Sequence, residues 1–101
     1  MKMQIKRLTP RAKLPTYGTA LSAGADLYVC LEEPVVMQPG QTAFLPTGLA
    51  VAVPEGYVGL VFARSSMGCK RGLAPANKVG VIDADYRGEV RVVLYNHGPE
   101  P

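Results

Sequence analysis

The segment best suited to chemistry lies near the C-terminus, at residues 80–90, and reads GVIDADYRGEV. It places the carboxylate of Asp83 after an apolar run and three residues before the ring of Tyr86, and an Arg-Gly turn follows. Because the chain has only one histidine, this Asp is the best candidate for a general base. An Asp between a β-branched run and a turn is more often a turn former than a catalyst, so the segment alone leaves both roles open.

Two further segments carry polar groups among small residues. The first reads AGADLY (residues 23–28), where Gly24 permits a tight bend and Asp26 can bind turn amides or face the water shell of a cation. The second reads ARSSMG (residues 63–68), where an Arg and two Ser follow an apolar strand. At the start of a helical turn, such residues can direct a guanidinium, hydroxyls and N–H groups toward one phosphate. The ordinary alternatives are a turn-forming Asp and a Ser cap beside a surface Arg.

Asn77 lies in a third polar segment, which reads APANKVG and precedes Asp83. On an expected hairpin, its amide group and the neighbouring backbone can read the edge of a planar heterocycle. Tyr86 can stack on a sugar, and a ring packed on the 2′ side leaves no room for a hydroxyl. The alternatives are a left-handed turn residue for Asn77 and core packing for Tyr86.

Bulk composition limits the classes of protein. A chain of 101 residues with 48% hydrophobic and 19% charged residues predicts one packed domain, residues 1–101. Cys30 and Cys69 are too few for a disulfide framework and lack the spacing of a metal site, so both are expected as reduced thiols, with Cys30 buried in a strand. Without a membrane-spanning apolar run or a secretory signal, the sequence predicts a cytoplasmic protein.

Positive charge is concentrated in two places. The net charge is +3, and residues 1–15 and 64–78 carry basic residues without acidic ones. No aromatic residues are interleaved in the pattern of a nucleic-acid site, so we expect neither a nucleic-acid nor a membrane partner.

Short strand-like runs separated by Pro and Gly predict an all-β fold with at most short helical turns. The expected strands cover residues 3–7, 26–31, 34–37, 42–54, 57–64 and 89–96. The run VGLVF (residues 58–62) is expected to be buried on both faces, and one helical turn is expected after Arg64.

Together, AGADLY, ARSSMG and GVIDADYRG resemble the first three motifs of the trimeric dUTPases, the deoxyuridine triphosphate nucleotidohydrolases, in family order. The resemblance extends from Lys6 to Gly98 and implies a distorted jelly-roll, or β-clip barrel, of dUTPase type. It implies hydrolysis of dUTP to dUMP and pyrophosphate by attack of water on the α-phosphorus. Such an enzyme removes dUTP from the nucleotide pool and supplies dUMP for dTMP synthesis.

The resemblance also implies a role for each matching residue. Asp83 would orient and deprotonate the water, and Tyr86 would pack on deoxyribose. Asp26 would act through water on a Mg²⁺ ion held mainly by triphosphate oxygens, with no direct protein ligand. The other residues expected to bind substrate, at its phosphates or its uracil, are Arg64, Ser65, Ser66, Gly68, Asn77, Gly80, Val81 and Ile82.

The sequence departs from the family pattern in two respects. Ala63 and Ser66 stand where many members have Pro and Gly. The sequence also stops at VVLYNHGPEP, before a fourth motif and a Gly-rich fifth motif whose aromatic ring covers the uracil of a neighbouring subunit's site. We therefore expect a C-terminally truncated piece of a homotrimer with sites at its subunit interfaces, in which this chain supplies an incomplete site.

Two alternatives differ in chemistry. A deoxycytidine triphosphate deaminase shares this fold and an Arg-Ser-Ser phosphate motif, but IDADYRG fits the hydrolase pattern better and no Glu has an obvious deamination role. A diverged or truncated relative that only binds nucleotide is the second alternative, and loss of Asp83 would distinguish it because a binder has no turnover to lose.

Overall fold

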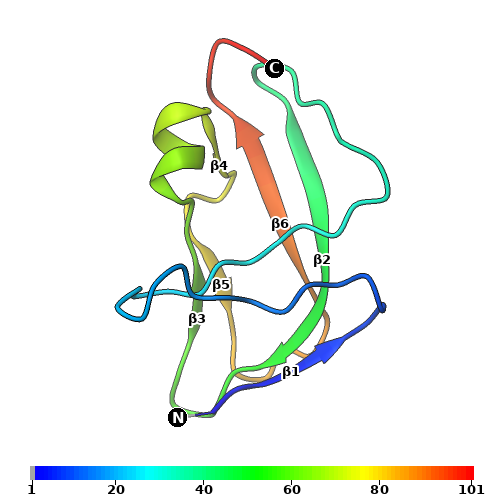
Figure 1. Cartoon of the computed structure of the whole chain (residues 1–101), viewed down its shortest axis with the longest axis vertical. Coiled ribbons are helices and arrows are strands. Elements are labelled where there is room, and N and C mark those ends of the chain that lie inside the picture. The colour runs from blue at the N-terminus through cyan, green and yellow to red at the C-terminus, as the bar shows by residue number, and fades with distance from the viewer. Residues whose placement is uncertain (1) are drawn as a thin grey trace.

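Two antiparallel β-sheets and one short helix make up the computed structural model, which describes residues 2–101 (Figure 1). The larger sheet has the order β1-β2-β6-β4, with bounds Gln4–Arg7, Thr42–Ala52, Glu89–Asn96 and Leu73–Pro75. The smaller sheet pairs β3 (Gly59–Val61) with β5 (Gly80–Ile82), and the helix η1 covers Ser66–Lys70. The all-β prediction and the helical turn after Arg64 are confirmed.

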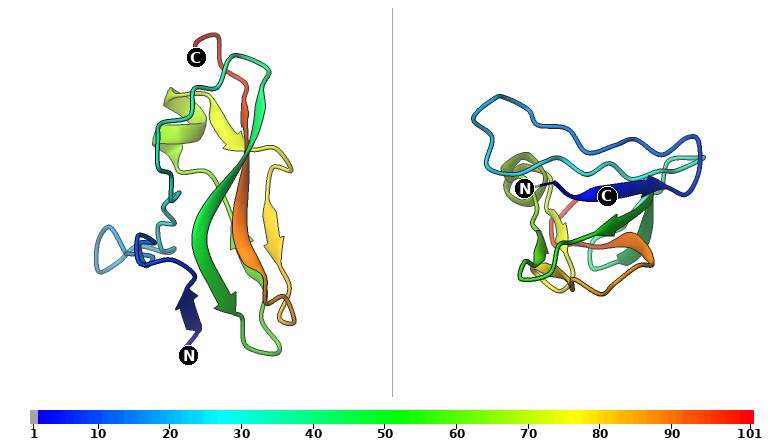
Figure 2. Two further views of the ribbon diagram at one scale, coloured as in Figure 1. Left: turned by 90° about the vertical axis from the view of Figure 1, so that its right-hand side faces the viewer. Right: turned by 90° about the horizontal axis from the view of Figure 1, so that it is seen from below.

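The long strands β2 and β6 form the centre of the molecule. They lie side by side, and the segments before β2 run as loops along one side of them (Figure 2). Their register shifts between Pro46 and Ala50, which marks a β-bulge. Within the bulge Gly48 has a φ of +70°, and a Cβ there would lie 2.9 Å from Cβ of Ala12. The bulge therefore requires glycine at this position.

The core joins both sheets. Its buried residues are Val51 at the end of β2, Val53 just after it and Val90 at the start of β6, and Ile82 from β5 packs against them. Leu27, which follows Asp26, packs against the same cluster. Segments AGADLY and GVIDADYRG are therefore held by one core.

Residues 26–31 and 34–37 are not strands, contrary to the sequence prediction. The first run makes only an isolated bridge between Thr16 and Asp26, and a hydrogen bond from Cys30 N–H to Pro46 C=O at 2.8 Å. Single contacts of this kind fix an extended chain without forming a ladder, so β-branched composition was not sufficient for a strand. Cys30 is thus half-buried and outside any strand, which corrects that expectation as well.

Strand β3 is shorter and more exposed than predicted. Only Gly59–Val61 form the strand, and Leu60 and Phe62 are 51% and 62% exposed. Among the described residues its only partner strand is β5, so no second layer covers both of its faces. The prediction of burial on both faces is wrong for this single chain. The three-residue strands β4 and β5 were not predicted as strands.

Asn96 joins the end of β6 to two neighbouring segments. Asn96 is only 1% exposed, and its Nδ2 donates to the carbonyls of Met37 and Glu100, both at 2.8 Å. Its Oδ1 accepts from Gly98 N–H at 3.0 Å. A Cβ on Gly72, which follows η1, would lie 2.6 Å from Cα of Gly98. The buried Asn96 amide and the close approach of Gly72 to Gly98 therefore fix the end of the molecule that carries η1.

Candidate functional site

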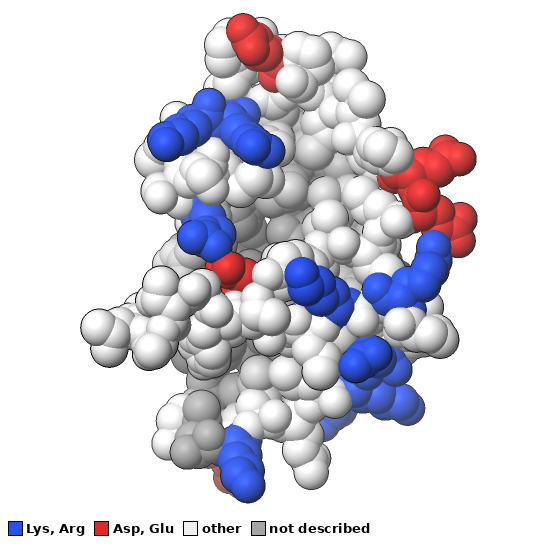
Figure 3. Space-filling view, viewed as in Figure 1, with Lys and Arg blue, Asp and Glu red and all other residues white. Residues whose placement is uncertain are grey.

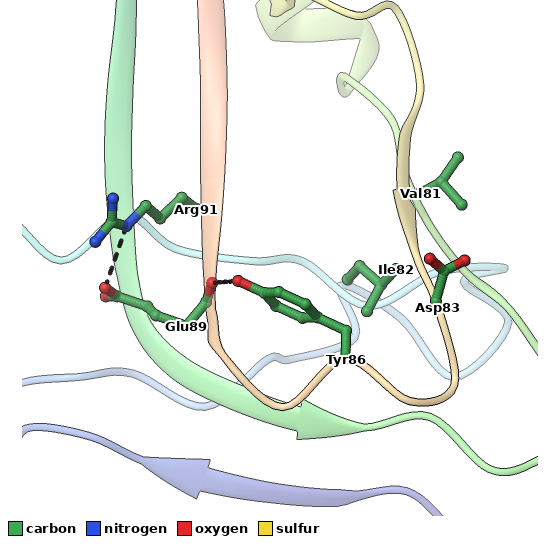
Figure 4. Close-up of a pocket in the computed structure, with 6 residues that line it drawn as sticks. All are labelled: Val81, Ile82, Asp83, Tyr86, Glu89 and Arg91. Carbon is green, nitrogen blue, oxygen red and sulfur yellow. Dashed lines mark hydrogen bonds and ion pairs between the residues drawn. The ribbon is translucent and has the colours of Figure 1, made fainter.

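Asp83 and Tyr86 lie in one open pocket of about 230 Å³. The end of β5, the turn after it and the start of β6 contribute its walls (Figure 4). The lining residues are Val81, Ile82, Asp83, Tyr86, Glu89 and Arg91. The local sequence thus places a carboxylate and an aromatic ring around one small space.

The ring of Tyr86 is held by its own turn. Its N–H donates to Asp83 C=O at 3.1 Å, and its hydroxyl donates to Glu89 C=O at 2.7 Å (Figure 4). A Cβ on Gly88 would lie 2.6 Å from the Tyr86 hydroxyl oxygen, so the turn requires glycine there. Tyr86 remains 45% exposed, which makes it a pocket wall rather than a core residue. The core-packing alternative for Tyr86 is therefore wrong.

Asp83 follows β5 directly and is exposed. Its backbone carbonyl accepts the Tyr86 N–H, which is the contact of a turn former. Its carboxylate takes part in no ion pair among residues 2–101. The residue therefore forms the turn with its backbone while its side chain stays available to a water molecule or a ligand.

Arg64 and Asp26 meet although they are 38 residues apart. The guanidinium Nη1 donates to Oδ2 of Asp26 at 2.6 Å. Asp26 is fixed by two backbone hydrogen bonds to Thr16, at 2.7 and 3.2 Å. The ion pair joins segments AGADLY and ARSSMG, with the Arg64 side chain 65% exposed and the Asp26 side chain 23% exposed.

The paired serines stand at the start of η1. Ser65 makes no side-chain capping hydrogen bond in the described structure, and both Ser65 and Ser66 are exposed. The N–H groups of Met67 and Gly68 already donate to Arg64 C=O, at 3.0 and 2.8 Å. The two hydroxyls, together with the guanidinium N–H groups of Arg64 that do not bind Asp26, are therefore better placed to meet an anion than these two amides. A Cβ on Gly68 would lie 3.3 Å from Cβ of Ala63, so the turn packs closely.

Asn77 lies in a turn between β4 and β5, not in a hairpin. The two strands pair with different partners, β4 with β6 and β5 with β3. Lys78 N–H donates to Pro75 C=O at 2.8 Å, and the left-handed residue is Lys78, with φ 69°, rather than Asn77. Asn77 is exposed, and its backbone carbonyl accepts the Val79 N–H. The expectation of a hairpin carrying Asn77 is therefore wrong.

The predicted site residues form two groups in this chain. Asp83, Tyr86, Val81 and Ile82 share the pocket, whereas none of the phosphate-site candidates lines it. In the β3–β5 ladder Gly59 faces Ile82 and Val61 faces Gly80. Asp83 thus follows one end of the ladder, and the chain leaves the opposite end toward Arg64 and η1 (Figure 1).

Sequence reasoning missed two pocket residues, Glu89 and Arg91. Their alternation with buried Val90 at the start of β6 places both side chains on the face away from the core. The alternation of polar and apolar residues immediately after the Arg-Gly turn is the signal in the sequence that could have placed these two side chains beside Tyr86.

Neither the charged side chains nor the residues that could bind a metal ion are gathered in one place in the described structure. Figure 3 shows basic side chains in several separate groups on the drawn face, with acidic side chains beside some of them. Among residues 2–101, no group of three or more His, Cys, Asp or Glu side chains could hold a metal ion. No helix in the described part of the chain has the length and apolar character needed to cross a membrane.

Comparison with protein families matches most of the chain. The family model described as dUTPase matches residues 10–101. The deoxyuridine 5′-triphosphate nucleotidohydrolase of Desulfitobacterium hafniense is 48% identical over an alignment of 102 positions, which covers 100% of this chain and 68% of that protein. The protein of the same name from Paraburkholderia phymatum is 46% identical over 97% of this chain and 68% of its own length.

Solved structures give the same result for the fold. The dUTPase from phage phi11 of S. aureus superposes with a TM-score of 0.87 and 34% identity, over 97% of this chain and 61% of that chain. A mutant dUTPase of Staphylococcus bacteriophage 80alpha, solved with dUpNHpp, gives a TM-score of 0.86 at 35% identity, over 96% and 55% of the two chains. The chain thus spans between half and two thirds of these solved chains, and the predicted dUTPase-type fold is confirmed.

Proposed function

Because the chain belongs to the dUTPase family, we propose that it hydrolyses dUTP to dUMP and pyrophosphate, with Asp83 as the general base. The observation that carries the proposal is the shared pocket of Asp83 and Tyr86, formed by the segment that resembles the family's third motif. The chain covers only part of its solved relatives, so the proposal concerns the whole protein to which these residues belong.

Asp83 supplies the proton chemistry. Its exposed carboxylate, without an ion-pair partner in the described structure, accepts a proton from a water molecule as that water attacks the α-phosphorus. The attached turn fixes the backbone of Asp83 through the Tyr86 N–H. Pyrophosphate leaves, and the hydroxyl from water remains on the phosphate of dUMP.

The pocket selects the nucleoside. Tyr86 packs on the deoxyribose and excludes a 2′-hydroxyl, because its hydroxyl is tied to Glu89 C=O and the ring has a fixed position. Asn77, together with backbone groups of Gly80, Val81 and Ile82, binds the uracil edge. A base bound along β5 lies next to the pocket that Val81 and Ile82 line.

The triphosphate is bound by Arg64, Ser65 and Ser66, with Gly68 allowing the turn to approach closely. Mg²⁺, when bound with the substrate, offsets phosphate charge and favours in-line attack. The donor set fits an ion held mostly by phosphate oxygens, since Asp26 offers one carboxylate and its neighbour Arg64 offers a phosphate-binding guanidinium. Asp26 would hold the water shell of that ion rather than the ion directly.

A homotrimer with sites at subunit interfaces would join the two groups of residues. Support comes from their positions at opposite ends of the β3–β5 ladder in one chain. Exposed apolar side chains on this ladder, Leu60 and Val81, and Phe62 directly after β3 also favour burial against another copy. We further propose that residues 1–101 form one domain and that the protein acts in the cytoplasm.

Product analysis tests the reaction. The full-length protein is incubated with Mg²⁺ and either dUTP or dCTP, and pyrophosphate and ammonia are measured. Pyrophosphate from dUTP without ammonia from dCTP is the expected result. Ammonia from dCTP would instead support a deaminase, and neither product would support a nucleotide binder, which calorimetric titration with a non-hydrolysable dUTP analogue would then detect.

Mass measurement in solution tests the assembly. Light scattering on the eluted protein should give three times the mass of one chain. A monomer that nevertheless hydrolyses dUTP would contradict the interfacial site.

A further inference from the structure

Glu89 makes three contacts that connect the central sheet to the ring of Tyr86. Its carboxylate Oε2 accepts the Gly48 N–H at 2.9 Å, and Oε1 lies 3.6 Å from Nε of Arg91. Its backbone carbonyl accepts the Tyr86 hydroxyl at 2.7 Å (Figure 4). The Glu89 side chain is 24% exposed and its contact with Gly48 is partly buried, whereas the Tyr86 hydrogen bond lies at the exposed surface.

The contact with Gly48 reaches a fixed point of the fold. Gly48 lies in the bulge of β2, and its carbonyl accepts the Leu8 N–H at 2.8 Å. The neighbouring Thr47 is fully buried and donates its hydroxyl to Val90 C=O at 2.6 Å. Since the bulge is held on both sides, the Glu89 carboxylate is anchored to backbone that has little freedom to move.

We propose that Glu89 is a positioning residue for Tyr86, and that it thereby sets the selectivity of the pocket for deoxyribose over ribose. The Glu89 brace, defined as Gly48, Glu89 and Tyr86 with the two hydrogen bonds between them, transmits the position of the β2 bulge to the ring. This inference rests on the proposed dUTP hydrolysis and adds a determinant of its specificity. Glu89 itself does not need to touch the nucleotide.

Selectivity against a 2′-hydroxyl depends on the rigidity of the Tyr86 ring. A ring excludes a single added hydroxyl only if it cannot move away from it, so discrimination requires support behind the ring. A hydrogen bond from a backbone N–H to an ionised carboxylate is stronger than a neutral one and suits this purpose. The longer contact with Arg91, whose side chain is 64% exposed, contributes less.

Two variants separate the brace from general stability. Glu89→Ala removes the acceptor for Gly48 N–H, whereas Glu89→Gln keeps an acceptor oxygen and loses only the charge. Glu32→Ala is the matched control, because Glu32 is also a carboxylate paired with an arginine, Arg11, at 3.1 Å. Thermal unfolding of each variant establishes that the protein is folded.

Ring motion is measured first, on ligand-free protein with ¹³C-labelled tyrosine, with the Tyr86 signals assigned from a Tyr86→Phe variant. Restricted Tyr86 motion is expected in the wild type, Glu89→Gln and Glu32→Ala proteins, and faster motion is expected in Glu89→Ala. Unchanged motion in Glu89→Ala would overturn the proposal. This readout does not depend on turnover.

Selectivity is measured next, as the ratio of kcat/KM for dUTP to that for UTP. Glu89→Ala should lower this ratio on the order of tenfold, the effect of about one hydrogen bond, while Glu89→Gln retains most of it. Faster ring motion with an unchanged ratio would overturn the role in specificity. A wild-type protein that hydrolyses neither nucleotide would refute the proposed function and the role in specificity, while the ring measurement would still decide whether Glu89 positions Tyr86.

Discussion

The Asp83 pocket and the Arg64–Asp26 ion pair are built in different ways. The pocket uses residues from one stretch, Val81 to Arg91, and its ring is fixed by hydrogen bonds within that stretch. The ion pair joins residues that are 38 positions apart, through one contact whose Arg side chain is 65% exposed.

The difference indicates how each half of the proposed site depends on its surroundings. A pocket lined by one stretch depends mainly on its local turn, with one long-range contact from Gly48 N–H to the Glu89 carboxylate. A single exposed ion pair contributes little to stability, so its geometry depends on the packing of both segments and on any ligand or neighbour that meets it. Changes in Asp83 should therefore affect chemistry, and changes around Arg64 should affect binding.

The largest effect is expected for Asp83→Asn. The amide keeps the size of the side chain but cannot accept the proton of water, so kcat should fall by about a hundred- to ten-thousandfold with nucleotide affinity largely retained. Pyrophosphate release and calorimetric binding of a non-hydrolysable dUTP analogue measure the two quantities. Asp85→Asn is the control, since Asp85 does not line this pocket. Equal losses in both variants would argue against Asp83 as the base.

The next largest effect is expected for Asn96→Ala. Loss of the buried amide leaves Met37 C=O, Glu100 C=O and Gly98 N–H without their partner and should lower the free energy of unfolding by about 2–3 kcal/mol. Thr47→Val, which removes a single buried hydroxyl near the pocket, should cost about half as much. Chemical denaturation measures the free energy of unfolding of both variants. A smaller loss for Asn96→Ala than for Thr47→Val would contradict the assignment of the three Asn96 contacts.

Arg64→Lys keeps the positive charge in the second half of the site but removes the planar guanidinium and its parallel N–H donors. We expect kcat/KM for dUTP to fall about ten- to one-hundredfold, mainly through a higher KM, because lysine cannot contact two phosphate oxygens in the same way. Initial rates across a range of dUTP concentrations measure this. A fall in kcat alone would place Arg64 in the chemical step instead.

The smallest effect is expected for Arg11→Ala. Arg11 and Glu32 form an exposed ion pair at 3.1 Å, with side chains 57% and 77% exposed, and neither is a candidate site residue. The free energy of unfolding should change by less than about 0.5 kcal/mol, and kcat/KM should be unchanged. A fall in kcat/KM as large as that of Arg64→Lys would mean that exposed ion pairs outside the site also affect activity in this fold.

Local features were predictable from the sequence, and long-range ones were not. Turn residues and apolar runs gave the all-β class, the helical turn after Arg64 and the grouping of Asp83 with Tyr86. The extended segments around Cys30 and Val35 have strand-like composition but no ladder partner, which depends on where distant backbone lies. For the same reason the exposure of Leu60 could not be inferred from its apolar neighbours. The roles assigned to individual site residues stay predictions.

The β3–β5 ladder has only three residue pairs, and it is the element that separates the two halves of the proposed site. A two-stranded ladder of this length has little stability of its own, so its amides should exchange with solvent deuterium well before those of β2 and β6. If copies of the chain assemble over this ladder, exchange there will slow while the central strands change little. Amide exchange along Gly59–Val61 and Gly80–Ile82 would then act as a direct gauge of assembly.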